Sequence, residues 1–305
     1  MEGELWSLLY RWVCEEAALK PRQRHVRYSD AWLLLVLLWA VVHDRPIRWA
    51  CREGNWPADQ RYRDIPSAAT MSRRTRTVSF RSLLAGLLQR LRDSDRSQGS
   101  LTLCRRVDSK PLPVGGFSKD TDAKRGYATG GLARGYKLFA AWGTARVPDA
   151  WTLGPMNRSD SEAAAKLVQE LSGDPHASGY LLGDALHDTN LLHRCCSRCG
   201  FQLIAPRCKP GTGMGHKDHD PARLRSIELL EGPAQLPWGV SNGFGPTLYA
   251  TRADIERAYG NLCTFGGGLQ PLPAWVRTPH RISLWVAAKL AINAARAVKN
   301  KGLAA

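Results

Sequence analysis

The chain has 305 residues and a formal net charge of +16 at pH 7, from 43 lysines and arginines against 27 aspartates and glutamates. The length allows one large domain or two smaller ones, and the charge favours a polyanionic partner, nucleic acid before an anionic membrane surface. The chain starts with acidic residues (Glu2, Glu4), unlike a secretory signal, and its most apolar segment, 31–42, is shorter than the roughly 20 residues that cross a bilayer. We therefore expect a soluble, cytoplasmic, DNA-associated protein and no membrane partner.

Residues 1–98 are predicted to form an N-terminal α-helical domain that binds DNA. Asp30 is placed to cap a buried helix over 31–42. Residues 66–76 resemble the turn and second helix of a helix-turn-helix, with Ser72 as the cap. In the alternative interpretation this is a solvated basic helix that packs on the second domain. The arginines expected to point outward are Arg73, Arg74 and Arg76.

An amphipathic helix over 80–91 is followed by a polar, turn-rich segment at 93–100, which marks the predicted domain boundary. The second domain is predicted to span residues 99–305. Its expected strands are 101–108, 135–142, 150–156, 179–184 and 201–205. Pro111 and Pro113 are expected to end the first strand, because proline cannot donate to a ladder.

Helices are predicted to alternate with the later strands. The expected helices follow a capping box at Ser159 and Glu162, run over 189–199 with Asp188 as the cap, and cover 222–230, 249–262 and 281–299. The second and third strands are expected to form a hairpin. This order of strands and helices is that of a ribonuclease-H-like α/β fold.

Three acidic residues are the candidate catalytic centre. Asp108 and Asp184 come at or just after predicted strands, and Glu256 lies on a helix whose polar face also carries Tyr249, Arg252 and Tyr259. Converging carboxylates repel one another unless cations lie between them, and Mg²⁺ prefers oxygen ligands. Two such ions about 3.5–4 Å apart support phosphoryl transfer.

Each acidic residue also has an ordinary structural explanation. Asp108 could be a turn residue before the prolines, and Asp184 a helix cap with Asp188 as its rival for the catalytic place. Glu256 could be only the solvated helical partner of Arg252. These alternatives stay open from spacing alone.

The same residues, with their neighbours, resemble the DDE transposases of bacterial insertion sequences. The similarity lies in Asp108-Ser-Lys-Pro-Leu-Pro-Val, Gly135-Tyr-Lys-Leu, Gly183-Asp184 with Asp188 and Asn190 following, and Arg252-x3-Glu256-Arg257. More narrowly, Tyr249, Arg252 and Glu256 match a branch with the signature Tyr-x2-Arg-x3-Glu-x6-Lys. Its lysine is missing here, because the fourth position falls on Cys263.

This resemblance implies a DNA transposase in which Asp108, Asp184 and Glu256 bind two divalent ions, Mg²⁺ or its substitute Mn²⁺. The implied reaction cuts DNA at the transposon end, frees a 3′-hydroxyl and joins it to target DNA, without a covalent protein–DNA intermediate. The implied partner is double-stranded DNA, bound by a homodimer because two ends must be brought together. Candidate DNA contacts in the second domain are Tyr249, Arg252, Arg257, Lys110, Lys137, Arg207 and Lys209.

Three other interpretations remain. A nuclease or resolvase on the same fold would hydrolyse DNA without joining strands, and an inactive relic would only bind DNA. A zinc-dependent binding module is the third, because cysteines and histidines gather in one region although their spacing matches no common zinc module. They are Cys195, Cys196, Cys199, Cys208, His216 and His219.

Overall fold

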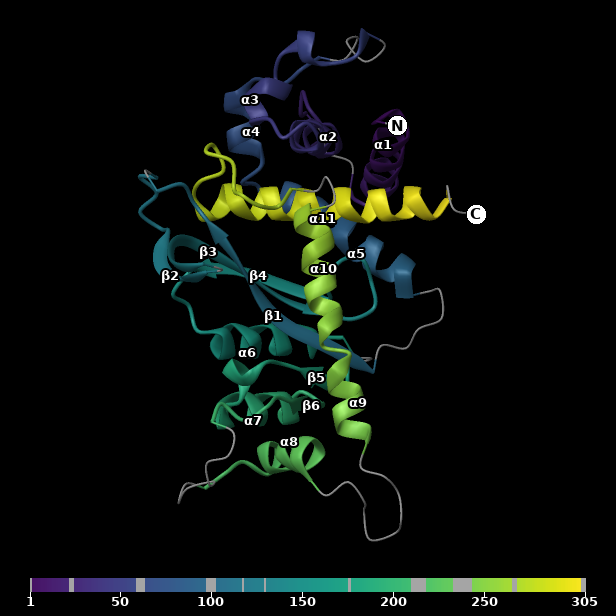
Figure 1. The fold of residues 1–305 in the computed structure, drawn as a ribbon. Coiled ribbons are helices and arrows are strands. Elements are labelled where there is room, and N and C mark those ends of the chain that lie inside the picture. The colour runs from purple at the N-terminus through teal and green to yellow at the C-terminus, as the bar shows by residue number, and fades with distance from the viewer. Residues whose placement is uncertain are drawn as a thin grey trace. The chain divides into compact units, whose positions relative to one another are not determined.

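The computed structural model describes residues 2–21, 25–58, 64–96, 103–116, 118–128, 130–174, 177–209, 218–232, 243–264 and 268–302. By contacts the chain divides into two units (Figure 1). Unit 1 comprises 1–97, 114–122 and 261–305, and unit 2 comprises 98–113 and 123–260. The prediction kept 99–305 together as one domain, whereas this division joins the C-terminal segment to the N-terminal helices.

The described secondary structure that belongs wholly to unit 1 is helical. Its elements are α1 (Glu2–Ala18), α2 (Asp30–Val42), α3 (Ile47–Ala50), the short 3-10 helix η1 (Glu53–Asn55), α4 (Ala68–Arg74), α5 (Val78–Arg96) and α11 (Pro279–Gly302). The helices predicted over 31–42, 80–91 and 281–299 are thus present as α2, α5 and α11. α11 contacts α1, α2 and α5, so its apolar side is buried within unit 1.

Three tryptophans form part of this core. The ring centroids of Trp6, Trp39 and Trp56 lie 4.9 to 6.0 Å apart. The indole N–H groups of Trp39 and Trp56 donate to the backbone carbonyls of Asn55 and Ala50. A large aromatic ring can be buried at little cost when its polar atom finds such a partner.

Two predicted helix caps were wrong by a few residues. Ser29 caps α2, and Asp30 is the first helical residue. Ser67 caps α4, so Ser72 lies inside that helix and no turn interrupts it. In both cases a hydroxyl oxygen accepts a backbone N–H of the first turn, which satisfies a donor that the helix itself leaves free.

Arg74 does not point outward as predicted. Its guanidinium lies 2.6 Å from a carboxylate oxygen of Asp30, and both side chains are largely buried. Arg74 therefore fastens α4 to α2. Arg73 and Arg76 on the same segment are exposed.

Unit 2 is built around one mixed sheet. Its strands are β1 (Cys104–Pro113), β2 (Lys124–Ala128), β3 (Gly131–Trp142), β4 (Ala150–Pro155), β5 (Gly179–Leu182) and β6 (Phe201–Ile204). The sheet order is β2-β3-β1-β5-β6, and β4 also pairs with β3. β1 is antiparallel to β3 and parallel to β5, which in turn is parallel to β6. This mixed α/β arrangement fits a ribonuclease-H-like fold.

The helices of unit 2 are α6 (Asp160–Leu171), the 3-10 turn η3 (Ala185–His187), α7 (Asn190–Arg198), α8 (Pro221–Glu231) and α9 (Phe244–Ala250). A further helix, α10 (Ala253–Thr264), crosses the division between the units. α6 contacts β1, β3 and β4, α7 contacts β6, and the two helices contact each other (Figure 1). Their buried residues share one core cluster with Val107, Phe139, Leu181 and Leu203 of the sheet.

Some local predictions for this unit are confirmed and one is wrong. β3 and β4 form the predicted hairpin, and Ser159 caps α6 through the backbone N–H of Glu162. β2 was not predicted. β1 does not end before its prolines: it continues to Pro113 and stays paired with β3. β5 pairs only with Cys104–Arg106. The later part of β1 is therefore unpaired on the β5 side, like an edge strand, and edge strands tolerate proline.

An ion pair is buried beside this core. Arg105 Nε lies 2.9 Å from Asp149 Oδ2, with side-chain exposures of 3% and 2%. The guanidinium also lies over the ring of Phe201, 5.6 Å from its centroid. Removing one member of such a pair leaves a buried charge without compensation.

We predict that Asp149→Ala lowers the free energy of unfolding by about 3–5 kcal/mol, because Arg105 is left charged and buried. Urea unfolding followed by circular dichroism measures the change. Asp64→Ala is the matched control, since Asp64 pairs with Arg27 where both side chains are exposed, and its loss should matter far less. Equal losses in the two variants would contradict the prediction.

Candidate active site

Two acidic side chains lie at the same level of neighbouring parallel strands. In the β1–β5 ladder Arg106 stands opposite Leu182. Asp108 and Asp184 each follow two residues later, Asp108 within β1 and Asp184 just after β5. Ends of parallel strands at one sheet edge are where α/β folds collect functional groups. The pairing of two short strands thus brings together residues far apart in the sequence.

The Asp108 carboxylate is costly to keep charged. Burial raises the pKa of Asp108, and the nearby charge of Asp184 adds to the rise. Two contacts act in the opposite direction: the Ser109 N–H donates to Oδ1 at 2.8 Å, and Arg252 Nη2 lies 3.2 Å from Oδ2. The net effect is a pKa above the usual range, so the site favours an additional cation.

Asp184 is better compensated. Burial alone would raise its pKa, but His187 and a backbone N–H lower it below the usual value. His187 Nδ1 lies 2.7 Å from Oδ1, and the Leu186 N–H donates to the same oxygen at 2.9 Å. Asp184 therefore favours the ionised form beside Asp108.

The helix predicted across Tyr249 and Glu256 is interrupted. α9 ends at Ala250, α10 begins at Ala253, and Arg252 lies in the connecting turn. The interruption has a tertiary cause, because Arg106 Nε donates to the carbonyl of Thr251 at 3.1 Å. Around the turn the backbone bonds span three residues, from Arg252 N–H to the Tyr249 carbonyl and from Asp254 N–H to that of Thr251.

Arg252 stands between two of the three acidic residues. Its Nη2 contacts Asp108 at 3.2 Å, and its Nη1 lies 3.4 Å from Glu256 Oε1. Within the described residues its Nε is buried and has no hydrogen-bond partner. Glu256 is 67% exposed and free to turn. Tyr249 lies close by: burial raises its pKa, and the charges of Arg252, Asp184 and Asp108 also act on it.

Two further residues fix α10 against the sheet. Tyr259 was predicted on a polar stripe, but it is buried, and its hydroxyl donates to the carbonyl of Asp108 at 3.0 Å. Arg106 pairs with Asp254 at 2.8 Å. Sequence reasoning missed Arg106 and His187. Strand periodicity could have indicated Arg106, which lies two residues before Asp108 and so on the same face of β1.

The two aspartates fit a divalent ion, whereas the full set of three is not assembled. Asp108 and Asp184 offer the carboxylate oxygens that Mg²⁺ prefers, and Asp108 lacks full charge compensation. Glu256 is turned to Arg252. In the part of the chain that the structure describes, no group of three or more histidine, cysteine or acidic residues is arranged to hold a metal.

A comparison with protein families decides the identity. A family model described as Transposase DDE domain matches residues 100–288. The chain belongs to the transposase DDE domain family. The matched range runs from before β1 into α11 and contains Asp108, Asp184 and Glu256. No curated protein and no solved structure matches the chain.

Membership of this family supports transposase activity of the nucleotidyl-transfer type, with DNA as the partner. DDE transposases depend in general on divalent metal ions. None of the helices in the described ranges of this transposase has both the length and the apolar character that a membrane crossing requires.

Several basic residues predicted to contact DNA are engaged in ion pairs in the transposase. Lys137 lies 2.9 Å from Asp160, where both side chains are 12% exposed. The other pairs are Arg207 with Glu231 and Arg257 with Asp254. Lys110 is half-buried on β1, and Lys209 is exposed after β6. Arg73, Arg74 and Arg76 belong to unit 1.

The transposase uses Asp188 for structure. Thr189, not Asp188, caps α7. Both carboxylate oxygens of Asp188 accept from Arg223 at 2.7 Å, and His193 Nε2 lies 3.4 Å away. Burial alone would raise the pKa of Asp188, but the hydrogen bonds from Arg223 hold it well below the usual range. This pair ties α8 to the segment that follows Asp184.

The cysteine cluster is packed in the core region. Cys196 is buried, and burial raises its pKa. Cys195 donates to the carbonyl of Ala165 at 3.7 Å, and both Cys195 and Cys199 pack against the core cluster of unit 2. Of the zinc candidates, His216 lies outside the described residues.

The lowered pKa of Asp188 predicts that the free energy of unfolding depends on pH. Its pKa is depressed in the folded state, so its stabilisation is present above the ordinary aspartate pKa of about 3.9 and is lost as the pH falls through the folded value. Arg223→Gln should destabilise the protein by about 3–5 kcal/mol at pH 7, where Asp188 is charged, and by less at about pH 3, which lies below the ordinary aspartate pKa.

Urea unfolding of the wild type and the variant at the two pH values measures this. Arg225→Gln is the control, since Arg225 is exposed on the same helix. A deficit for Arg223→Gln that does not change with pH would refute the role of the Asp188 charge.

Proposed function

We propose that this chain is a DNA transposase in which Asp108, Asp184 and Glu256 hold two divalent ions, Mg²⁺ or Mn²⁺. It cuts DNA at transposon ends and joins the freed 3′-hydroxyl to target DNA. The observation that best supports this is the parallel pairing of β1 and β5, which sets Asp108 beside Asp184 at one sheet level. The family match across the same residues supports it independently.

The protein residues have distinct roles in this proposal. Asp108 and Asp184 supply the carboxylate oxygens, and His187 keeps Asp184 ionised and oriented. When bound, the ions supply activation of the attacking oxygen and charge stabilisation of the leaving oxygen. Tyr259 and Arg106 hold α10 against β1, so that Glu256 stays within reach of the aspartates.

Arg252 has two alternating partners in this proposal. In the structure its guanidinium compensates Asp108 and Glu256. Its planar fork suits a DNA phosphate equally well, through two parallel hydrogen bonds. With ions and DNA bound, Glu256 would be available as a ligand and the Arg252 guanidinium would pair with a DNA phosphate. Tyr249 lies beside the same position.

The DNA is double-stranded, from the transposon terminal repeats and from the target. We assign its contacts in unit 2 to Lys110, Lys209 and Arg257, and to Lys137 and Arg207 where DNA competes with their carboxylate partners. In the N-terminal segment, proposed as the DNA-binding domain, the exposed Arg73 and Arg76 are the contacts, and Arg74 supports them. The active assembly is a homodimer that brings two ends together.

One experiment separates this function from its alternatives. Purified protein, Mn²⁺ and a labelled duplex with a transposon end are incubated with a plasmid target. Joined products identify a transposase, and cleavage without joining identifies a nuclease or resolvase. Binding without cleavage would leave an inactive DNA-binding relic.

We predict that Asp108→Asn, Asp184→Asn and Glu256→Gln each abolish cleavage and leave DNA binding within a few-fold. Each change keeps the shape of the side chain but removes the charge that holds the ions. Nicking of the labelled duplex and gel-shift titration measure the two properties. Glu162→Gln is the control, because the Glu162 side chain is exposed on α6. A variant that still cleaves at the wild-type rate would remove its residue from the site.

If Arg252 changes partners in this way, replacing it should have opposite effects on metal binding and on catalysis. Without DNA, Arg252→Gln should bind Mn²⁺ more tightly than the wild type, because the competing guanidinium is gone. Its DNA-end affinity and cleavage should fall, on the order of the 1.5–3 kcal/mol of a charged hydrogen bond. Calorimetric Mn²⁺ titration and end-binding assays measure both.

The matched control is Arg257→Gln, an exposed arginine one turn into α10 that pairs with Asp254. It should leave Mn²⁺ affinity unchanged. If Arg252→Gln instead weakens Mn²⁺ binding, then the guanidinium supports the metal site and does not compete with it.

A further inference from the structure

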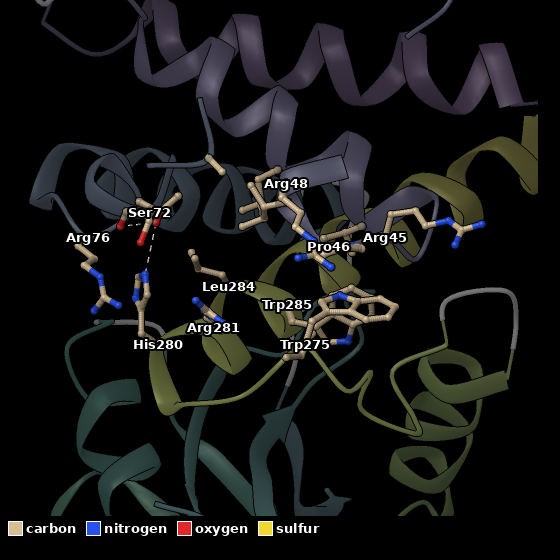
Figure 2. A pocket seen from close by; sticks show the side chains of 16 residues that line it. Arg45, Pro46, Arg48, Ser72, Arg76, Trp275, His280, Arg281, Leu284 and Trp285 are labelled. Carbon is tan, nitrogen blue, oxygen red and sulfur yellow. Dashed lines mark hydrogen bonds between the residues drawn. The ribbon is translucent and has the colours of Figure 1, made fainter. Parts of the chain in front are cut away.

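Unit 1 contains a pocket that the proposed chemistry does not use. It has a volume of about 420 Å³ and lies between residues of α2, α3, α4 and α11 (Figure 2). Its walls are largely apolar and include Trp275 and Trp285, whereas its remaining lining is basic or hydroxylic. This combination of apolar walls with a few polar groups is typical of small-ligand sites.

The indole N–H of Trp285 lacks an acceptor. Trp285 is 3% exposed, and among the described residues its Nε1 has no hydrogen-bond partner. A buried tryptophan N–H normally finds one, as those of Trp39 and Trp56 do in the same unit. Trp285 lines the pocket, and a turn of its ring would present this buried donor to an occupant that carries an acceptor.

The pocket is also strongly basic. Its lining includes four arginines, Arg45, Arg48, Arg76 and Arg281, and no aspartate or glutamate occurs among the described residues that line it. In Figure 2 Arg76 lies with His280 on one side, Arg48 lies on the other, and the guanidinium of Arg45 points away. The Lys289 ammonium lies 4.7 Å from the centroid of the Trp285 ring, but it is paired with the Asp44 carboxylate and is not part of this basic lining.

His280 belongs to this lining. Burial lowers its pKa, and the charges of Arg76, Arg81 and Arg281 lower it further. Its Nε2 lies 3.4 Å from the hydroxyl of Thr75. The neutral ring thus adds a hydrogen-bonding group without adding another charge.

We propose that this pocket binds a nucleotide, with the base between the apolar walls and the phosphate at the arginines. A flat ring with acceptor atoms matches the tryptophan lining and the unpaired Trp285 N–H. A phosphate matches arginines, which hold it by paired hydrogen bonds. The same chemistry comes from a free mononucleotide or from an unpaired nucleotide of a DNA strand, and the test distinguishes the two.

The test uses 2′-deoxyadenosine 5′-monophosphate (dAMP) as the probe, with the full-length protein. Calorimetry measures its affinity, and nuclear magnetic resonance follows the tryptophan indole N–H signals. We expect saturable binding with a Kd below about 1 mM, and a shift of one indole signal that is absent in Trp285→Phe. Trp285→Phe keeps a ring but loses the donor, so dAMP should bind about tenfold more weakly.

Trp285→Phe changes a buried side chain, so variants at exposed arginines provide a second test that does not disturb the core. Arg48→Gln and Arg281→Gln change exposed side chains, and each should weaken dAMP binding several-fold but change the binding of phosphate-free deoxyadenosine little. Arg11→Gln on the exposed side of α1 is the control. The inactive Asp108→Asn protein should bind dAMP normally, so this site and the proposed catalytic function can fail separately.

Competition identifies the source of the nucleotide. Displacement of dAMP by a short single strand, but not by a paired duplex of the same length, assigns the pocket to unpaired DNA. Displacement by neither assigns it to a free nucleotide. The proposal is overturned if dAMP does not saturate, if the Trp285 signal and the arginine variants show no effect, or if duplex competes as well as the single strand.

Discussion

The arrangement of unit 2 depends on one constraint: it must accommodate two carboxylates, Asp108 and Asp184, at the same level of the adjacent strands β1 and β5. The β1–β5 register makes Asp108 and Asp184 neighbours, and burial makes the charge of Asp108 expensive. His187 satisfies one carboxylate and Arg252 approaches the other. A folded protein that keeps such a pair must supply positive charge there, from its own arginine or from bound cations.

Five of the six strands in the described sheet and the order of the later helices could be predicted, because they follow local periodicity and capping. The aspartates could be located because Asp108 lies in the strand-like run of β1 and Asp184 follows closely on β5. Several failures depended on contacts between residues far apart in the sequence. The continuation of β1 through Pro113 requires that β5 pair only with its first part. The break before α10 requires Arg106 to take the Thr251 carbonyl, and the inward turn of Arg74 requires Asp30. None of these partners lies near its target in the sequence.

The arginines of this basic chain fall into different physical classes, so net charge alone does not map its DNA surface. Arg105 and Arg223 are held by buried or nearly buried aspartates and serve stability. Arg252 compensates catalytic candidates, and Arg48 and Arg281 border a pocket. Only exposed side chains such as Arg73 match the simple expectation of a solvated basic face. Composition indicates the partner, while burial and pairing decide which residues reach it.

The central claim is that Asp108, Asp184 and Glu256 jointly hold two divalent ions when a DNA end is bound. Electron paramagnetic resonance of Mn²⁺ with the protein and a pre-cleaved transposon end tests it most directly, because coupled ions give a spectrum distinct from isolated ones. The account predicts a spin-coupled pair at two Mn²⁺ per active site. A spectrum of isolated Mn²⁺, at any stoichiometry, would contradict it.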